Sequence, residues 1–276
     1  MRFPALILCL FFATQFSAAA VGIDVVSYRA RLTVEPSARY IDGVVTVTFR
    51  NVMRSDLHSV QLDVRTLTTD YVEQEGVPLV FSANDSVLTI QLDTPLRSLD
   101  TTELTVWYHG TPSFSEIEQG GVHFGPRSVW AHPQSAHTRY VAMTPHWIPC
   151  NNLFSDKAIY DLTFNTPNGW RAASMGTLIE ESVNQGRMLS RWVLRDPIHP
   201  AGAGWSVGQY EVYHDTLRGI PFCAYVWPEW KTYAEDYFRT IDSMLAVFET
   251  NFGPYPAEKI GFVFTDSTSV EKHTMI

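Results

Sequence analysis

The stretch Tyr40–Asn51 reads YIDGVVTVTFRN, and within it Val45, Val47 and Phe49 alternate with polar neighbours. A period of two is typical of a β-strand that buries one face and exposes the other to water. The pair Asp42-Gly43 precedes the alternation and predicts a turn at the start of the strand. We therefore expect a half-buried strand here, paired with neighbours in an antiparallel sheet.

The same alternation extends outward from this stretch in short runs separated by turn residues. No segment of any length with a helical period interrupts these runs before Trp227. We therefore predict a mainly β chain in which residues 21–227 form one large antiparallel domain, a β-sandwich or a saddle-shaped stack of sheets. The further runs are Leu32 with Val34, Val87–Leu92, Leu104–Tyr108, Ile159–Phe164, Met188–Leu194, Gly208–His214 and Ile220–Val226.

The pattern changes after Trp227-Pro228. Apolar residues then recur at spacings of three and four, which places them on one face of a helix that Gly253-Pro254 would end. We expect this face to pack in a core, because such a stripe is far more often core than a cofactor site. Ile260–Phe264 then reads as a buried strand, so residues 228–276 are predicted to be the incomplete start of an α+β domain. The stripe consists of Trp230, Tyr233, Ala234, Tyr237, Phe238, Ile241, Met244, Leu245 and Phe248.

Residues 1–20 have the pattern of an export signal. Arg2 gives a positive start, residues 5–16 are an apolar run, and Ser17–Ala20 offers a small-residue cleavage site. The apolar run is shorter than the roughly 20 residues of a membrane-spanning helix, although an uncleaved anchor is the alternative. We expect an exported protein, extracellular or periplasmic, without a membrane span in the mature chain.

Charge and cysteine content exclude further classes. The formal net charge is −9, and the basic residues form no run, which argues against nucleic acid as a partner. Cys150 and Cys223 are the cysteines beyond the export signal, and two thiols in so long a chain make no disulfide framework. We favour two buried thiols, with a disulfide between them as the open alternative.

Asn84-Asp85-Ser86 matches a glycosylation acceptor and is informative only in a glycosylating host.

Three segments, in order along the chain, resemble the M1 family of zinc aminopeptidases. Tyr28–Asn51 is similar to the opening hairpin of that family. His146–Cys150, Ser155–Ala158 and Thr166–Trp170 resemble its aromatic-Pro-Cys segment, Lys-Ala step and Pro-x-Gly-aromatic turn. Asn251–Pro256 reads NFGPYP and resembles the turn that precedes the family's exopeptidase motif. The resemblance implies a β domain over residues 21–227 and the start of a thermolysin-like catalytic domain over 228–276.

The exopeptidase motif of the family, Gly-x-Met-Glu-Asn, aligns with the segment around Ser269, Val270 and Glu271. The resemblance implies that Glu271 binds the substrate's α-amino group, since a carboxylate gives a protonated amine a charge-assisted hydrogen bond. The segment departs from the motif: Thr268 and Ser269 replace small residues, Val270 replaces Met and Lys272 replaces Asn or His. Taken alone, Glu271-Lys272-His273 reads as a solvated charge cluster.

The family's second substrate contact has no clear counterpart, and Gln134, Arg139 and Tyr140 all lie in its region.

The zinc motif of such an enzyme is His-Glu-x-x-His on a helix, and no histidine of this chain is followed by glutamate. His132, His137 and His146 have spacings that fit no standard zinc motif. We therefore expect no metal ligand and no catalytic residue in this chain, with zinc as the cofactor of the complete enzyme only.

These observations support one function and two alternatives. The leading hypothesis is the front part of an exported zinc-dependent aminopeptidase, a hydrolase that removes N-terminal residues from peptides with free amino termini. A non-catalytic β-sandwich binding module derived from the same family is the alternative. A sugar-binding sandwich would account for the exposed Trp and Tyr residues, but strands that hold those residues account for them equally well.

Overall fold

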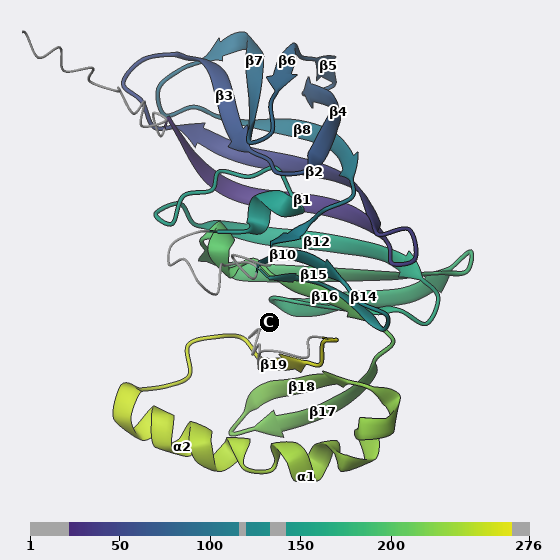
Figure 1. The fold of residues 1–276 in the computed structure, drawn as a ribbon. Helices are drawn as coiled ribbons and strands as arrows, with labels where there is room; N and C mark the ends of the chain where they lie inside the picture. Colours follow the sequence, from purple (N-terminus) through teal and green to yellow (C-terminus); the bar gives the residue numbers. More distant parts are fainter. Residues whose placement is uncertain (1–21, 116–119, 133–141, 267–276) are drawn as a thin grey trace, which may run out of the picture.

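The computed structural model describes residues 22–115, 120–132 and 142–266, so the predicted export signal lies outside the described residues. Most of the described chain forms β-strands, arranged in a tall body above a smaller sheet that is flanked by helices (Figure 1). The mainly β prediction is confirmed. Among the described residues, no helix is long and apolar enough to cross a membrane.

An eight-stranded sheet forms the centre of the body, in the order β14-β15-β12-β1-β2-β8-β4-β5. Its neighbours pair antiparallel except β1 and β12, which run parallel from Ser27 opposite Ile159 to Thr33 opposite Asn165. Its strands are β1 (Ile23–Glu35), β2 (Tyr40–Asn51), β4 (Leu67–Gln74), β5 (Val77–Pro78), β8 (Thr101–Gly110), β12 (Ala158–Pro167), β14 (Thr177–Asn184) and β15 (Arg187–Ile198).

The predicted turn at Asp42-Gly43 is wrong, because β2 begins at Tyr40 and both residues lie inside it. The chain reverses earlier, where the amide of Arg39 donates to the carbonyl of Pro36 and Arg39 has a φ of 53°. Gly43 has a packing reason instead: the ring of Tyr108 on β8 covers it, and a Cβ there would lie 2.3 Å from a ring carbon.

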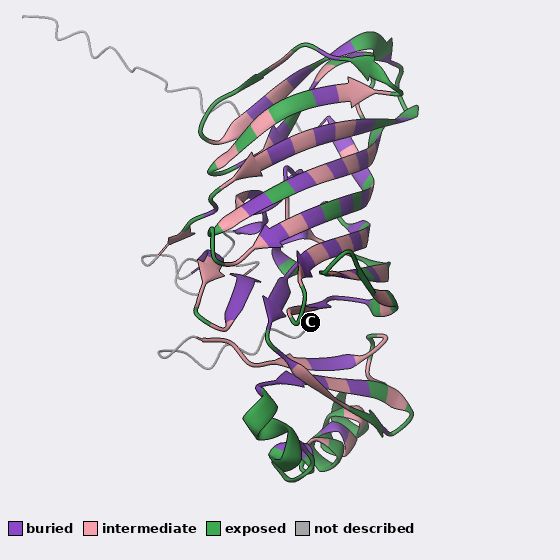
Figure 2. Cartoon of the chain, turned by 90° about the vertical axis from the view of Figure 1, so that its right-hand side faces the viewer, coloured by how far each residue is buried: buried purple, intermediate pink, exposed green. Residues whose placement is uncertain are grey.

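Two further sheets complete the body. One has the order β13-β16-β11-β10-β9 and the other β3-β7-β6. Side chains of all three sheets share one apolar core, in which Trp147 meets Trp205 edge to face. Figure 2 shows buried residues alternating with more exposed ones along the strands of the large sheet, as the period of two predicts. The additional elements are β3 (Leu57–Asp63), β6 (Phe81–Ala83), β7 (Val87–Leu96), β9 (Phe114–Ser115), β10 (Gly120–Phe124), β11 (Ser128–His132), η1 (Thr144–His146), β13 (Arg171–Ser174), η2 (Pro200–Gly202) and β16 (Trp205–Gly208).

The smaller sheet consists of β17 (Glu211–Leu217), β18 (Ile220–Val226) and β19 (Ile260–Val263), with β19 parallel to β18. It has a separate apolar core, which includes Phe222 and Phe238. Strands from both sides of Trp227 thus pair in this sheet. The predicted domain boundary after residue 227 stays a prediction.

The single amphipathic helix that we predicted is three shorter segments: η3 (Pro228–Tyr233), α1 (Ala234–Phe238) and α2 (Ile241–Phe252). Gly253, with a φ of 92°, ends α2 as predicted and donates its amide to the carbonyl of Glu249. The 3₁₀ segment η3 leads directly into α1, and a turn at residues 239–240 separates α1 from α2, so the apolar residues do not follow one continuous α-helix.

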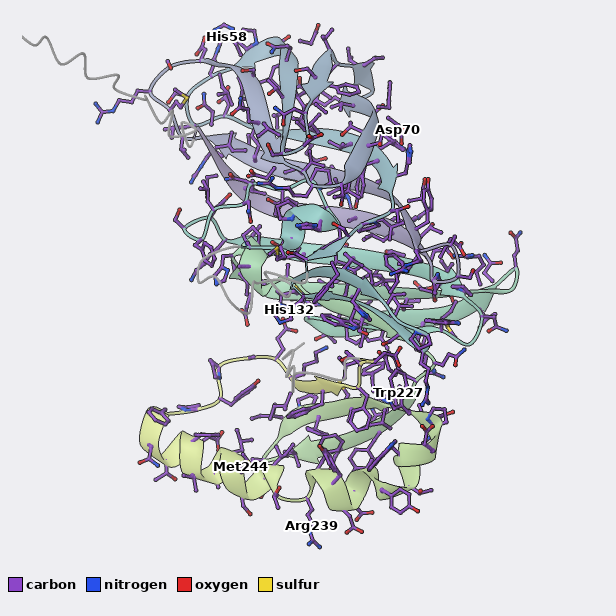
Figure 3. All side chains as sticks on the ribbon, viewed as in Figure 1. His58, Asp70, His132, Trp227, Arg239 and Met244 are labelled. Carbon is purple, nitrogen blue, oxygen red and sulfur yellow. The ribbon has the colours of Figure 1, made fainter. Side chains whose placement is uncertain are left out.

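The apolar stripe packs in a core only in part, and five of its nine residues are exposed. Ala234, Phe238 and Leu245 are buried against the small sheet. In contrast, Tyr237 is 60 % exposed and Met244, visible on α2 in Figure 3, is 53 % exposed. Trp230, Tyr233 and Phe248 are also exposed. The small sheet is narrow and covers only one side of the helices, which leaves the other side in contact with solvent.

Candidate functional site

The predicted site residues Ser269, Val270 and Glu271 lie outside the described residues, as do Thr268 and Lys272. The candidates for the second substrate contact, Gln134, Arg139 and Tyr140, and also His137 and His273, lie outside them too. The structure therefore describes the approach to the candidate site, up to Asp266, and the roles of these residues stay predictions.

The NFGPYP turn leads directly into β19. Glu249, in the last turn of α2, accepts the amide of Tyr255 at 3.5 Å, and the Tyr255 hydroxyl donates to the carbonyl of Lys259 at 3.3 Å. β19 then pairs with β18, and just beyond it the amide of Phe264 donates to the carbonyl of Tyr225 at 2.9 Å. The contacts of Tyr255 thus position the start of β19, and the bond from Phe264 to Tyr225 extends its pairing with β18 by one residue.

The end of this segment is bonded to the turn between β10 and β11. Asp266 Oδ2 accepts the backbone amides of Arg127 and Ser128, each at 2.7 Å, and the Ser128 hydroxyl at 3.1 Å. The Asp266 amide in turn donates to Ser128 Oγ at 3.2 Å. Gly125 makes the approach possible, because a Cβ there would lie 2.6 Å from Oδ2. We name this set of bonds the Asp266 clasp.

A second set of contacts joins the same turn to the start of η3. The Arg127 guanidinium donates two hydrogen bonds to Glu229, at 2.7 and 2.9 Å, and lies 4.2 Å from the ring centre of Trp227. The hydrogen bonds from Arg127 lower the pKa of the Glu229 carboxyl, and the same bonds raise the pKa of Arg127. Figure 3 shows Trp227 at the junction between the body and the small sheet. Since this ion pair is exposed, it orients the start of η3 relative to the β10–β11 turn more than it stabilises the fold.

Tyr210, two residues beyond the end of β16, completes the junction. Its hydroxyl donates to the carbonyl of Phe264 at 2.8 Å and shares a 2.7 Å hydrogen bond with Ser206, while its ring stacks on Trp227. The pKa of Tyr210 is raised by burial, so the hydroxyl remains a donor at neutral pH. The segment that precedes the candidate site is therefore held by side chains from three separate parts of the chain.

The aromatic-Pro-Cys segment has a structural role in the described chain. Cys150 exchanges two backbone hydrogen bonds with Asp63, at 2.7 and 3.0 Å, and the amide of Asn151 donates to the hydroxyl of Tyr28 at 2.9 Å. Asp156 accepts the amide of Val25 at 3.1 Å, a contact that sequence reasoning missed. These bonds tie the loop to β1 and β3, deep in the main core.

The cysteines are unpaired thiols, which excludes the disulfide alternative for Cys150 and Cys223. Cys150 is fully buried and Cys223 is half-buried. Burial raises the pKa of both thiols. Because the thiolate is the nucleophilic form, this burial disfavours a role for either thiol as a nucleophile at neutral pH.

The described histidines do not assemble into a metal site. His146, in η1, has its pKa lowered to about 4, first by burial and then by the positive charge of Arg65. His132, on β11, packs edge to face against Trp130. Across residues 22–115, 120–132 and 142–266, no three His, Cys, Asp or Glu side chains come together as metal ligands.

Comparison with known proteins connects this geometry to solved structures. No protein-family model matches the sequence. No curated protein matches it either. An M1 zinc metallopeptidase from Deinococcus radiodurans is similar over 90 % of this chain and 57 % of its own, with a TM-score of 0.74 and 23 % identity. The chain shares the fold of M1 zinc metallopeptidases.

Two further structures support the same fold. A mutant M1 zinc metallopeptidase from D. radiodurans bound to a Tyr-Ser-Ala substrate has a TM-score of 0.74, with 23 % identity over 90 % of this chain. Native yeast LTA4 hydrolase has a TM-score of 0.70, with 15 % identity over 88 % of this chain and 37 % of its own. The chain thus spans only 58 % of the length of the mutant metallopeptidase that is bound to Tyr-Ser-Ala.

Proposed function

We propose that this chain is the front part of an exported zinc-dependent aminopeptidase, a hydrolase that removes N-terminal residues from peptides. The observation that carries the proposal is the M1 metallopeptidase fold over 90 % of the chain. A D. radiodurans protein with this fold binds the peptide Tyr-Ser-Ala. Peptides with free amino termini are accordingly the proposed substrates.

Glu271 is the proposed contact for the substrate's α-ammonium group, with Ser269 and Val270 in the same motif. Glu271 follows Asp266 by only five positions in the sequence. The clasp holds Asp266 by three hydrogen bonds, so the last described residue before the motif is fixed to the β domain. A carboxylate held near a fixed point can select a protonated amine, because a charge-assisted hydrogen bond depends on geometry.

Zinc belongs in this proposal to the complete enzyme and to no described residue of this chain. The described residues do not fit a zinc site, since they bring no three ligand-type side chains together. We therefore assign no catalytic step to them. Their proposed contribution is to place the amine-binding segment relative to the β domain.

The exposed side of the helices is the feature that the binding-module alternative explains least well. Trp230, Tyr233, Tyr237, Phe248 and Phe252 are all exposed, and Phe252 is 84 % exposed. A large exposed apolar surface marks a place where other protein packs. We propose that a further part of the same enzyme, corresponding to the remaining length of the M1 metallopeptidases, covers this side.

Export is proposed from the sequence of residues 1–20 alone. Mass spectrometry of the protein purified from its host should find the mature amino terminus near residue 21. A mature chain that retains residues 1–20 would remove the export signal from the proposal.

The complete reading frame that contains this sequence tests the main proposal. It should encode His-Glu-x-x-His, and the complete protein should bind zinc and hydrolyse aminoacyl arylamides in a chelator-sensitive way. A complete protein without zinc and without such hydrolysis would favour the non-catalytic binding module.

A further inference from the structure

A cleft separates the lower edge of the body from the segment that leads into β19. Its volume is about 410 Å³, within the range of roughly 300–1,000 Å³ that is usual for small-molecule sites. Apolar side chains form most of its wall, among them Met175, Leu194, Ile198 and Tyr255. The cleft has the size and the lining of a site for a small, mainly apolar molecule.

One half-buried lysine, Lys259, contributes to this lining. Lys259 Nζ donates a hydrogen bond to the carbonyl of Ser174 at 2.6 Å and lies 4.1 Å from the ring centre of Trp192. Among the described residues, no carboxylate lies within ion-pair distance of Nζ. A carbonyl and an aromatic ring stabilise a cation only in part, and a poorly compensated buried charge is costly. The part of the chain that the structure describes therefore supplies no counter-ion to Lys259.

The carboxylate next in sequence does not fill this role. Glu258 accepts the hydroxyl of Thr177 at 2.6 Å and the amide of Arg195 at 3.2 Å, and its carboxylate lies 3.9 Å from the Arg195 guanidinium. It is thus directed to β14 and β15. Lys157 brings a second positive charge to the lining. His199, also in the lining, has a buried Nδ1 without a hydrogen-bond partner among the described residues.

We propose that this cleft binds a small monocarboxylate with an apolar body. The carboxylate pairs with the Lys259 ammonium, and the apolar body packs against Met175, Leu194 and Tyr255. Such a ligand supplies the missing counter-ion and removes apolar wall from water in the same step. The proposal does not depend on the aminopeptidase function, because it uses none of the proposed substrate contacts Glu271, Ser269 and Val270.

Ionisation of Lys259 makes the binding depend on pH. Burial lowers the pKa of Lys259 to about 8, while Cys223 on β18 and Glu258 act weakly in the opposite direction. The other ionisable groups of the cleft are Lys157, His199 and Tyr255, with Arg195 beside Glu258. A bound carboxylate favours the ammonium form and raises this pKa. Binding should therefore be tightest below pH 8, weaken above it, and take up protons near pH 8.

Isothermal titration of the chain with 4-phenylbutyrate at pH 7 tests the proposal. We expect saturable binding at one site, and binding of the uncharged 4-phenylbutan-1-ol weaker by at least about tenfold. Lys259→Met should weaken 4-phenylbutyrate binding by a similar factor. Lys231→Met is the matched control, because Lys231 is an exposed lysine outside the cleft that pairs with Glu211. It should bind like the unmodified chain.

A second variant keeps the test decisive if Lys259→Met fails to fold. Ala257 is an exposed residue of the cleft lining, so Ala257→Trp should block the cleft without disturbing the fold or the ammonium. It should abolish binding. Titration near pH 8 in two buffers of different ionisation enthalpy should reveal the proton uptake. The proposal is wrong if binding is never saturable, if the alcohol binds as well as the acid, or if folded Lys259→Met and Ala257→Trp both bind normally.

Discussion

The carboxylate of Asp266 lies 2.7 Å from the backbone amide of Ser128, a residue 138 positions earlier in the chain. With the amide of Arg127 and the hydroxyl of Ser128, this carboxylate joins the end of the small sheet to the body of the protein. Backbone amides hold a carboxylate in a defined orientation, because they cannot rotate away as side chains do. The clasp thus fixes the end of the small sheet to the turn between β10 and β11.

Asp266→Ala should lower the free energy of unfolding by about 1–3 kcal/mol, because the amides of Arg127 and Ser128 lose their acceptor in a partly buried turn. Urea unfolding measures this loss, and hydrogen exchange should show reduced protection of both amides. The control is Asp215→Ala, an exposed carboxylate that accepts the adjacent Thr216 amide. Unchanged protection in Asp266→Ala would show that the clasp is not formed in solution.

Gly43→Ala should destabilise the large sheet by about 1–3 kcal/mol, because its Cβ would lie 2.3 Å from the ring of Tyr108. Tyr108→Leu removes the ring atoms with which the new Cβ would clash. Gly43→Ala should therefore cost less stability in the Tyr108→Leu background than in the unmodified chain. A double-mutant cycle in urea measures the coupling. Additive effects of the two substitutions would contradict the packing reason that we give for Gly43.

His146 should make stability depend on pH in the acidic range. Its folded pKa is about 4 against an ordinary value of 6.5, so the unfolded chain binds a proton that the folded chain does not. Stability should therefore be complete above pH 6.5 and fall as the pH drops towards 4, by roughly 3 kcal/mol at most. His146→Gln should flatten this slope in urea unfolding at several pH values.

The matched control for that experiment is His58→Gln, at the exposed end of the body in Figure 3. It should leave the slope as it is. An equal slope in the unmodified chain and in His146→Gln would mean that His146 is accessible to protons in the folded state.

Two residues of α2 should respond differently to the same substitution. Leu245 is buried against the small sheet and Phe248 is 53 % exposed. Leu245→Ala should cost about 2 kcal/mol or more, and Phe248→Ala should change stability by no more than about 0.5 kcal/mol. Thermal unfolding followed by circular dichroism compares the two. If Phe248→Ala costs as much as Leu245→Ala, the exposed side of the helices is covered in solution.

Much of the fold could be predicted from local patterns. The alternation of Val45, Val47 and Phe49 identified a half-buried strand because side chains of a strand point to opposite faces in turn. The same alternation is compatible with parallel and antiparallel pairing, so the parallel contact of β1 with β12 could not be predicted. Gly43 was misread for a related reason: glycine indicates a turn or a close approach equally well, and only the partner strand shows Tyr108 above it.

Two kinds of feature could not be predicted from the sequence: the breaks within the helical region and the contacts between distant segments. Spacings of three and four from Trp230 to Phe248 do not distinguish one continuous helix from a 3₁₀ segment followed by two α-helices. The contacts of Asp266 with Ser128, and of Lys259 with Trp192, join residues far apart in the sequence and have no local signal. The motif around Glu271 was found only through resemblance to a family, and its geometry lies outside the described residues.

The central claim is that this chain supplies the amine-binding residue of an aminopeptidase, and one kinetic comparison tests it most directly. In the complete enzyme, kcat/KM should be measured for a free and an N-acetylated substrate, with and without Glu271→Ala. Loss of a charge-assisted hydrogen bond predicts a drop of roughly 10- to 150-fold for the free substrate, with unchanged zinc content and weaker discrimination against the acetylated one. If Glu271→Ala retains both full activity and full discrimination, Glu271 is only a solvated charge and the claim is wrong.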